Sequence, residues 1–303
     1  MILILTALLL LSPFITAQDV LPGMLTQCAS PSQFALTFDD GPSEFTQQLL
    51  SMLDEHHVPA TFFVLGTQVD QPQFQQVFRD TYARGHQIAV HTYDHPHLNA
   101  LSPKQIKDQL SRTDQAIRNV IGVSPQYMRP PFGECLEQCQ QIVQGMGYTI
   151  VEWNLDSNDW RYAQSPRLQS KVTTNFIQEL DKVAGNTSSS HIPPTSTFIS
   201  LQHDIQGFSV SQTPAIIRDI KRRGYSFVTV AECAGSERKP MYSNAPDSLF
   251  KPGNTQLPPM VTAANTGNIS TPIHTLHSMA TPRLLLSTPA FLVSLVMSIV
   301  MFS

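Results

Sequence analysis

The feature that most constrains the fold is an alternation of short apolar runs with longer amphipathic segments between residues 33 and 232. Strands that alternate with helices of this length form βαβ units, which pair into a parallel sheet. We therefore predict a single α/β domain, built either as a barrel or as a doubly wound sheet. In a barrel, catalytic groups would lie at the carboxyl ends of the strands. The runs that predict seven strands are 33–38, 60–65, 87–90, a short one before Arg129, 148–153, 197–201 and 225–230.

Residues 1–17 form an apolar run that ends in small residues and is followed by the polar pair Gln18 and Asp19. A membrane span needs about 20 apolar residues, and this run is shorter. We therefore predict a signal peptide, although the run lacks a basic start. An uncleaved anchor or a buried helix is the alternative.

The C-terminal region consists of a polar segment, which contains a cluster of small residues, and an apolar tail. Residues 236–283 are rich in Pro, Ser, Thr and Asn and include a cluster of small residues around Asn265, and residues 284–303 are apolar with no basic residue after them. A small-residue site, a polar spacer and an apolar tail are typical of a GPI-attachment signal. We predict a stalk at 236–283, attachment near Asn265 and a removable tail at 284–303, which would anchor the protein to a membrane. A tail-anchored helix is the alternative.

The four cysteines suit an oxidising compartment. Cys135 and Cys139 lie four residues apart, so a local disulfide is plausible, and Cys28 with Cys233 would then join the two ends of a domain spanning 28–235. A zinc site of four thiolates is the alternative, but export favours disulfides.

Glycosylation sequons and the charge content also fit an exported protein. Sequons occur at Asn186 and Asn268, which agrees with an extracellular location at the plasma membrane or cell wall. Only 14% of the residues are charged and the net charge is -4, which argues against a nucleic-acid partner.

Two aspartates end the first predicted strand, in the sequence Thr-Phe-Asp-Asp-Gly-Pro. Successive strand residues face opposite ways, so Asp39 and Asp40 cannot both point inward from a regular strand. The break into Gly41 and Pro42 relaxes that limit, and both carboxylates could then reach one site. A turn capped by Asp is the alternative.

The third predicted strand ends in His-Thr-Tyr-Asp-His. On a helical turn, His91 and His95 would share a face, which is a spacing suited to one metal ion. With Asp40 as third ligand, a divalent ion would keep open positions for water, as catalytic zinc sites do. An accidental spacing is the alternative, because histidine is frequent in this chain.

Three further segments follow predicted strands: Arg-Pro-Pro-Phe-Gly at 129–133, Asp-Ser-Asn-Asp-Trp at 156–160, and Leu-Gln-His at 201–203. Each has a structural explanation when it is taken alone, as a rigid turn or a buried Asp–His pair. Together with the two earlier segments they resemble the five motifs of the polysaccharide deacetylases of carbohydrate esterase family 4, and especially the fungal chitin deacetylases. The match keeps the motif order and spans about residues 33–232.

The resemblance implies a distorted (β/α) barrel that hydrolyses acetamide groups with one divalent metal ion, zinc or cobalt. It implies a chitin or chitooligosaccharide substrate and an enzyme that acts as a monomer. The resemblance implies that Asp39 is the general base and His203 the general acid, and that Arg129 and Asp159 support them. It implies that the backbone N–H of Phe132 stabilises the oxyanion. It also implies that Asp40, His91 and His95 bind the metal and that Trp160 and Leu201 form the wall of the acetyl pocket.

The assigned roles form a coherent reaction. A bound metal lowers the pKa of water to about 7, so that an ordinary carboxylate suffices as the base. Pairing with Arg129 is expected to lower the proton affinity of Asp39, and Asp159 is expected to favour the charged form of His203. Deacetylation of peptidoglycan or of xylan esters is an alternative on the same fold, and a glycan-binding wall protein without turnover is a second alternative.

Overall fold

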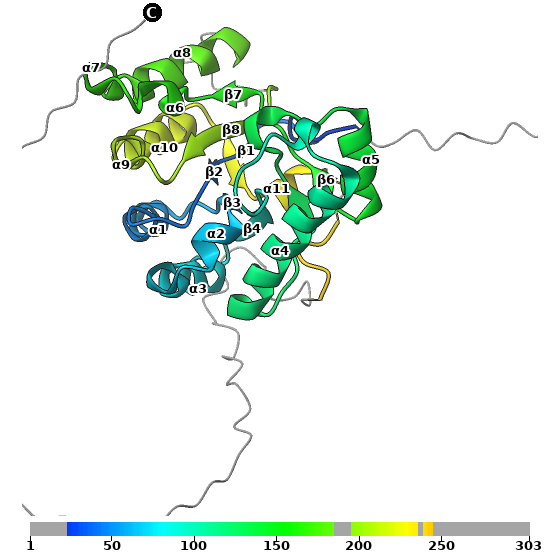
Figure 1. The fold of residues 1–303 in the computed structure, drawn as a ribbon. Coiled ribbons are helices and arrows are strands. Elements are labelled where there is room, and N and C mark those ends of the chain that lie inside the picture. The colour runs from blue at the N-terminus through cyan, green and yellow to red at the C-terminus, as the bar shows by residue number, and fades with distance from the viewer. Residues whose placement is uncertain (1–22, 185–194, 236–238, 245–303) are drawn as a thin grey trace, which may run out of the picture. The chain divides into compact units, whose positions relative to one another are not determined.

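The computed structural model describes residues 23–184, 195–235 and 239–244. Strands lie at the centre and helices surround them (Figure 1). Every ladder between named strands is parallel. The strands are β1 (Gln33–Ala35), β2 (Thr37–Asp39), β3 (Thr61–Val64), β4 (Gln87–Val90), β5 (Tyr127–Met128), β6 (Thr149–Ile150), β7 (Leu155–Asp156), β8 (Phe198–His203) and β9 (Ser226–Val228).

The sheet curls into an incomplete barrel. Its order is β6-β5-β4-β3-β2-β8-β1-β9, and β7 pairs with β8 as well. The chain runs from β6 directly to β7, so the strands from β2 to β8 form a ring with one open seam. At that seam Leu25 pairs along β6: its N–H donates to Ile150 O at 2.9 Å, and its carbonyl accepts from Glu152 N at 2.8 Å.

The helices follow the strands in alternation, as the sequence predicts. They are α1 (Thr46–Glu55), α2 (Gly66–Val69), α3 (Gln75–Ala83), α4 (Pro103–Ile121), α5 (Glu137–Gly145), α6 (Asp159–Tyr162), α7 (Pro166–Gln169), α8 (Val172–Ala184), α9 (Gly207–Val210), α10 (Thr213–Arg222) and α11 (Val230–Cys233). Short 3-10 turns in the described residues are η1 (Pro72–Phe74), η2 (Leu98–Ala100) and η3 (Pro131–Gly133). Only two residues separate α7 from α8.

Local signals in the sequence account for the longest helix of the described residues, α4. Ser102 and Gln105 form a reciprocal capping box at its start, which satisfies two otherwise free backbone N–H groups. Gly122 ends the helix in the left-handed conformation, φ 76°, which glycine adopts without a steric penalty. Ile106, Leu110 and other residues at helical spacing are buried on one face. Helix α4 is therefore capped at both ends and packed against the core along one face.

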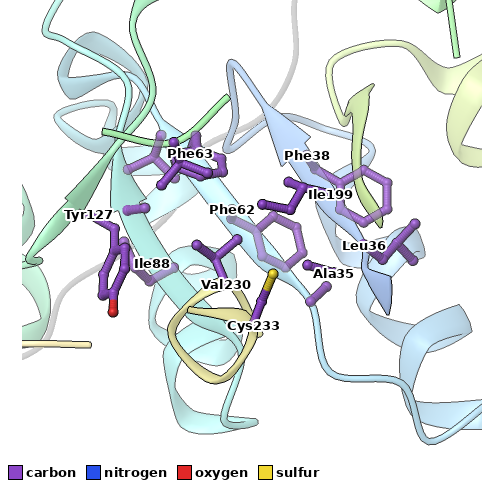
Figure 2. Packing of buried hydrophobic residues seen from close by; sticks show 14 of the residues in the cluster. Ala35, Leu36, Phe38, Phe62, Phe63, Ile88, Tyr127, Ile199, Val230 and Cys233 are labelled. Carbon is purple, nitrogen blue, oxygen red and sulfur yellow. The ribbon is translucent and has the colours of Figure 1, made fainter. Parts of the chain in front are cut away.

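The amino ends of the strands are closed by α11. Val230 N donates to Thr61 Oγ1 at 3.0 Å, and Ala231 N donates to Gln87 Oε1 at 2.8 Å; Thr61 and Gln87 are the first residues of β3 and β4. Figure 2 shows Val230 and Cys233 close to Phe62 in the core. The carboxyl ends of the strands lie at the opposite end of the barrel, and the candidate site is at that end.

The structure contains both disulfides that we predicted from the sequence. Cys28–Cys233 joins residues 205 positions apart, and Cys135–Cys139 joins the start of α5 to the segment before it. No cysteine of the described residues is free.

The packed domain extends further than the predicted boundary at residue 235. Tyr242 is buried, its hydroxyl accepts from Ile88 N at 2.9 Å, and it forms an antiparallel bridge with Pro125. The stalk therefore cannot begin at residue 236. Composition could not indicate that this short segment packs on the domain. It lies in a stretch rich in small polar residues, and only one buried tyrosine and its backbone pairing hold it in place.

The predicted α/β class and the single domain are confirmed. The expected strand at 33–38 is interrupted at Leu36, where one side of the chain changes its partner from β9 to β3. Strand β7 was not predicted, because its two residues closely follow the expected strand at 148–153 and no separate apolar run marks them. Counting β1 and β2 as one kinked strand, the described part of the domain has eight strands where the sequence indicated seven.

Several predictions concern parts of the chain outside the described residues. These are the signal peptide at 1–17, the glycosylation sites Asn186 and Asn268, the attachment site Asn265, most of the stalk and the tail at 284–303. Within the part of the chain that the structure describes, no helix is both long enough and apolar enough to cross a membrane.

Candidate active site

The predicted site residues gather at the carboxyl ends of neighbouring strands. Asp39 ends β2 and His203 ends β8, and the two are paired in register. His91 directly follows β4, and Arg129 directly follows β5. The sheet order β5-β4-β3-β2-β8 therefore brings together residues that are far apart in the sequence.

Both aspartates of the first motif face the site because the strand ends between them. Asp40 adopts the left-handed conformation, φ 74°, and the peptide bond between Gly41 and Pro42 is cis. Left-handed residues other than glycine are uncommon and cluster at functional sites. The reversal turns the side chain of Asp40 to the same side as that of Asp39.

Asp40, His91 and His95 offer ligand atoms that all lie within 4.8 Å of one another. Asp40 Oδ1 lies 3.5 Å from His91 Nε2 and 3.6 Å from His95 Nε2. That oxygen is buried and accepts no hydrogen bond from any described residue. A buried carboxylate oxygen without a donor, facing two imidazole nitrogens, fits a divalent cation.

The protonation of His91 also suits a metal ligand. Its Nδ1 lies 2.8 Å from the carbonyl oxygen of Arg129, which can only accept, so Nδ1 carries the proton and Nε2 presents its lone pair to the site. Burial lowers the pKa of His91 to about 3, with the charge of Asp40 opposing the shift. The ring is therefore neutral at physiological pH.

The two histidines meet without a helix, in contrast to our prediction of a helical turn. The segment that carries them is irregular, and Thr92 and His95 both have left-handed backbones, with φ 69° and 61°. A hydrogen bond from His95 N to Thr92 Oγ1 at 3.2 Å stabilises the turn. These reversals bring the two ring centroids within 5.0 Å.

Asp39 is buried beside Arg129. Arg129 Nη1 donates to Asp39 Oδ1 and to Thr37 Oγ1, both at 2.8 Å, and the guanidinium is fully buried. Burial raises the pKa of Asp39. The charge and the hydrogen bond of Arg129 lower that pKa, as we expected, but burial outweighs them. A higher pKa makes the carboxylate a stronger base.

His203 and Asp159 form a second buried pair. Asp159 Oδ1 lies 2.7 Å from His203 Nδ1, and its Oδ2 accepts from His203 N at 2.8 Å. Burial alone would lower the pKa of His203, but the charge and the hydrogen bond of Asp159 outweigh it and raise the pKa to about 10. His203 is therefore an imidazolium at neutral pH, with Nε2 as its remaining donor.

The other three predicted residues lie in different surroundings. Phe132 is half exposed, has φ 60°, and packs edge-on against the ring of His95 at 4.5 Å. Trp160 is also half exposed, and its Nε1 donates to Asp156 Oδ2 at 3.2 Å. Leu201 is buried but lies outside the main hydrophobic cluster.

Sequence reasoning did not single out three polar residues around this site. Thr37 accepts a hydrogen bond from Arg129 and donates to Ser200 O. Burial raises the pKa of both Glu152 and Asp204 to about 7. Thr37 is the first residue of the first motif and Asp204 directly follows the last one, which was the available signal.

The arrangement combines three elements of hydrolytic chemistry. A carboxylate, Asp39, and an imidazolium, His203, are fixed by separate buried partners, and the candidate metal ligands lie beside Asp39, whose Oδ2 is 3.8 Å from His91 Nε2. A base and an acid held apart around a cation site can transfer protons to and from one substrate.

Comparisons with known proteins agree with this geometry. The polysaccharide deacetylase family model matches residues 26–151. A chitin deacetylase of Colletotrichum lindemuthianum is 35% identical over 244 residues, which cover 79% of this chain and 91% of the relative. A peptidoglycan-N-acetylglucosamine deacetylase of Bacillus cereus is 32% identical over 200 residues, which cover 66% of this chain and 67% of the relative.

The fold comparison gives the same result. The solved structure of the Colletotrichum lindemuthianum chitin deacetylase matches with a TM-score of 0.63 at 34% identity, covering 73% of this chain and 95% of that chain. This chain belongs to the polysaccharide deacetylase family of carbohydrate esterase family 4. It is a deacetylase enzyme whose substrate is of the chitin or peptidoglycan type.

Proposed function

We propose that the enzyme hydrolyses the N-acetyl groups of N-acetylglucosamine units in chitin, giving chitosan and acetate. The observation that carries the proposal is the pairing of two differently tuned groups, Asp39 with Arg129 and His203 with Asp159, beside the Asp40–His91–His95 cluster. The fungal chitin deacetylase that covers 79% of this chain supports chitin as the substrate.

The proposed roles follow from the protein groups. A divalent ion held by Asp40, His91 and His95, zinc or cobalt, would supply Lewis acidity that makes water more acidic and polarises the acetyl carbonyl. Asp39 accepts the proton of the attacking water, because its carboxylate is held by Arg129 and faces the cluster. The backbone N–H of Phe132 donates to the developing oxyanion.

His203 completes the proposed reaction as the general acid. Amide hydrolysis requires protonation of the leaving amine, and Asp159 keeps His203 charged and oriented through Nδ1, so that Nε2 is the donor. Trp160 and Leu201 would bound the pocket for the acetyl methyl group. Leu201 suits that role because it is buried two positions before His203 on β8.

Peptidoglycan deacetylation is the second candidate, because a Bacillus cereus enzyme with that name is 32% identical over 66% of this chain. Acetylated xylan is a third. We expect acetate release from chitooligosaccharides to exceed release from peptidoglycan fragments and acetylxylan at equal acetyl concentration. A preference for either of the other two substrates would overturn the assignment of chitin.

The acid role has its own test in the leaving group. An ester leaves as an alkoxide that needs less assistance than an amine, so His203→Gln should reduce hydrolysis of N-acetylglucosamine oligomers more than hydrolysis of an acetyl ester. Equal loss on both substrates would argue against His203 as the proton donor.

We also propose that the enzyme acts outside the cell, held to the surface by a GPI anchor. The two disulfides support an oxidising compartment. Release of active enzyme from intact cells by a phosphatidylinositol-specific phospholipase would support the anchor. Retention in the membrane after that treatment would favour a helical tail instead.

A further inference from the structure

The loop that carries His91 and His95 is irregular, so neighbouring elements must hold its shape. On one side it is held by α2: Gly66 N donates to Thr92 O at 3.1 Å, and Thr67 N donates to Tyr93 O at 2.9 Å. These bonds satisfy two carbonyl groups of the loop but none of its N–H groups. The N–H groups of Tyr93 and Asp94 face the other way, toward α4.

A single side chain of α4, Gln109, satisfies those N–H groups. Gln109 Oε1 accepts from Tyr93 N at 2.9 Å and from Asp94 N at 3.2 Å, and Gln109 Nε2 donates to Asp94 Oδ1 at 2.8 Å. Gln109 is buried, and Thr113 Oγ1 donates to its backbone carbonyl oxygen at 2.8 Å. Both polar atoms of the Gln109 side chain are therefore engaged with the loop.

The orientation of this amide is determined by its partners. Two backbone N–H groups can only donate, so the atom that faces them must be Oε1, and the atom that faces the carboxylate of Asp94 must be Nε2. Gln109 thus holds the two residues that lie between Thr92 and His95. The backbones of Thr92 and His95 themselves are left-handed.

We infer that Gln109 is a positioning residue for the metal: it sets the separation of His91 and His95 and thereby the affinity of the site. The inference rests on the proposed metal site. Groups that orient metal ligands typically contribute about 10- to 100-fold to metal affinity. Gln109 acts one step further away, through the backbone of the loop, so we expect its loss to weaken zinc binding by roughly tenfold.

An exchange of chemical groups tests this inference directly. In Gln109→Glu, one carboxylate oxygen still accepts from both N–H groups, but the other faces Asp94 Oδ1, where two acceptors repel. Asp94→Asn alone is harmless, because the new amide can present its oxygen to Gln109 Nε2. In the double variant, the amide introduced at position 94 presents its NH₂ to the carboxylate introduced at position 109. A donor–acceptor pair is thereby restored, with the direction of the hydrogen bond reversed.

The experiment measures the dissociation constant for zinc alone by competition with a chromogenic chelator, on the metal-free full chain. We expect Gln109→Glu to weaken binding roughly tenfold, Asp94→Asn to leave it unchanged, and the double variant to recover most of the loss. Gln115→Glu is the matched control, because it adds the same charge to the exposed face of the same helix. It should bind zinc as the wild type does.

Different results would overturn different claims. If wild-type protein binds no zinc, the proposed metal site itself is wrong. If wild-type protein binds zinc and folded Gln109→Glu binds it equally well, or if the double variant does not recover affinity, the role of Gln109 is wrong. Should Gln109→Glu not fold, Gln109→Asn shortens the side chain without adding charge. The inference requires this variant to bind zinc more weakly, and unchanged affinity would refute it.

Discussion

At the scale of single residues, the site contains two titratable groups, Asp39 and His203, whose pKa values are set by different surroundings. Asp39 is buried beside a cation and keeps a raised pKa because desolvation outweighs the charge of Arg129. His203 is buried beside an anion, and that charge overcomes desolvation and raises its pKa to about 10. The first group is suited to accept a proton and the second to donate one, which matches the proposed roles of base and acid.

Replacing the base should abolish turnover without removing the metal ligands. The amide oxygen that Asp39→Asn introduces can still accept a hydrogen bond from Arg129, so we expect this variant to fold, to bind zinc, and to lose roughly 10²- to 10⁴-fold in kcat. Steady-state acetate release and zinc titration measure the two properties. The control is Asp54→Asn, an exposed aspartate paired with Arg84. Near-normal kcat in Asp39→Asn would exclude it as the base.

The His203–Asp159 pair should make stability depend on pH in a defined direction. The pKa of His203 rises from 6.5 to about 10 on folding, so its contribution is complete below pH 6.5 and is lost as pH rises toward 10. The lowered pKa of Asp159 gives a contribution that is present above pH 3.8 and lost as pH falls below it.

Denaturant unfolding of wild type and His203→Gln across this range measures the effect. We expect the difference in the free energy of unfolding to be largest between about pH 4 and 6.5 and to shrink toward pH 10. A difference that stays constant or grows with increasing pH would contradict the charged pair.

At the scale of elements, the carboxyl ends of the parallel strands determine where the site forms, and the helices determine how firmly it is held. Helix α4 bears Gln109, and its first turn is stabilised by the capping box of Ser102 and Gln105. The amino ends of β3 and β4 are closed by α11. Packing at one end of the barrel therefore leaves the other end free for irregular loops.

The capping box should be measurable in stability. We expect Ser102→Ala to lower the free energy of unfolding by about 1 kcal/mol, because it leaves a backbone N–H of the first turn without its side-chain acceptor. Ser51→Ala is the control, since Ser51 is exposed within α1 and donates only to Gln47 O. Chemical denaturation compares the two. Equal effects would show that the cap adds nothing beyond loss of a hydroxyl.

The strand and helix pattern could be predicted because it depends on periodicity and local caps. The division of the first strand at Leu36 could not, because it reflects a change of neighbour from β9 to β3. Strand β7 was missed because it closely follows the expected strand at 148–153 and its pairing with β8 depends on the folded sheet. The packed segment at 239–244 was missed because its anchor, Tyr242, binds Ile88 across a long sequence separation.

The site was predictable residue by residue only through motif resemblance. Physical reasoning alone proposed Asp40, His91 and His95 as metal ligands but gave the wrong local geometry for the histidines, since left-handed backbones at Thr92 and His95 leave no periodic signal. The contacts of Gln109 could not be predicted from the sequence either, because side-chain hydrogen bonds between α4 and the loop depend on the folded packing.

At the scale of the whole molecule, the two disulfides close loops of very different length. Cys28–Cys233 spans 205 residues and joins segments near the two chain ends of the domain, and Cys135–Cys139 spans 4. In the loop-entropy model, stabilisation grows with the length of the closed loop. The long disulfide is therefore expected to dominate the covalent contribution to stability.

Removing each disulfide tests that expectation. The loop-entropy model gives a loss of about 5 kcal/mol for Cys28→Ala with Cys233→Ala, and of about 2 kcal/mol for Cys135→Ala with Cys139→Ala. Unfolding by denaturant under oxidising conditions measures both double variants. A larger loss from the short loop would show that local packing, not chain entropy, sets the contribution of each disulfide.

We propose that this chain is a metal-dependent deacetylase of N-acetylglucosamine polymers. Mass spectrometry of the products from defined N-acetylglucosamine oligomers, with purified enzyme before and after chelation, tests it most directly. We expect oligomers that lose acetyl groups with the chain length intact, no reaction after chelation, and recovery when zinc or cobalt is added. Deacetylation that persists in full after complete metal removal, or intact substrate in every condition, would contradict it.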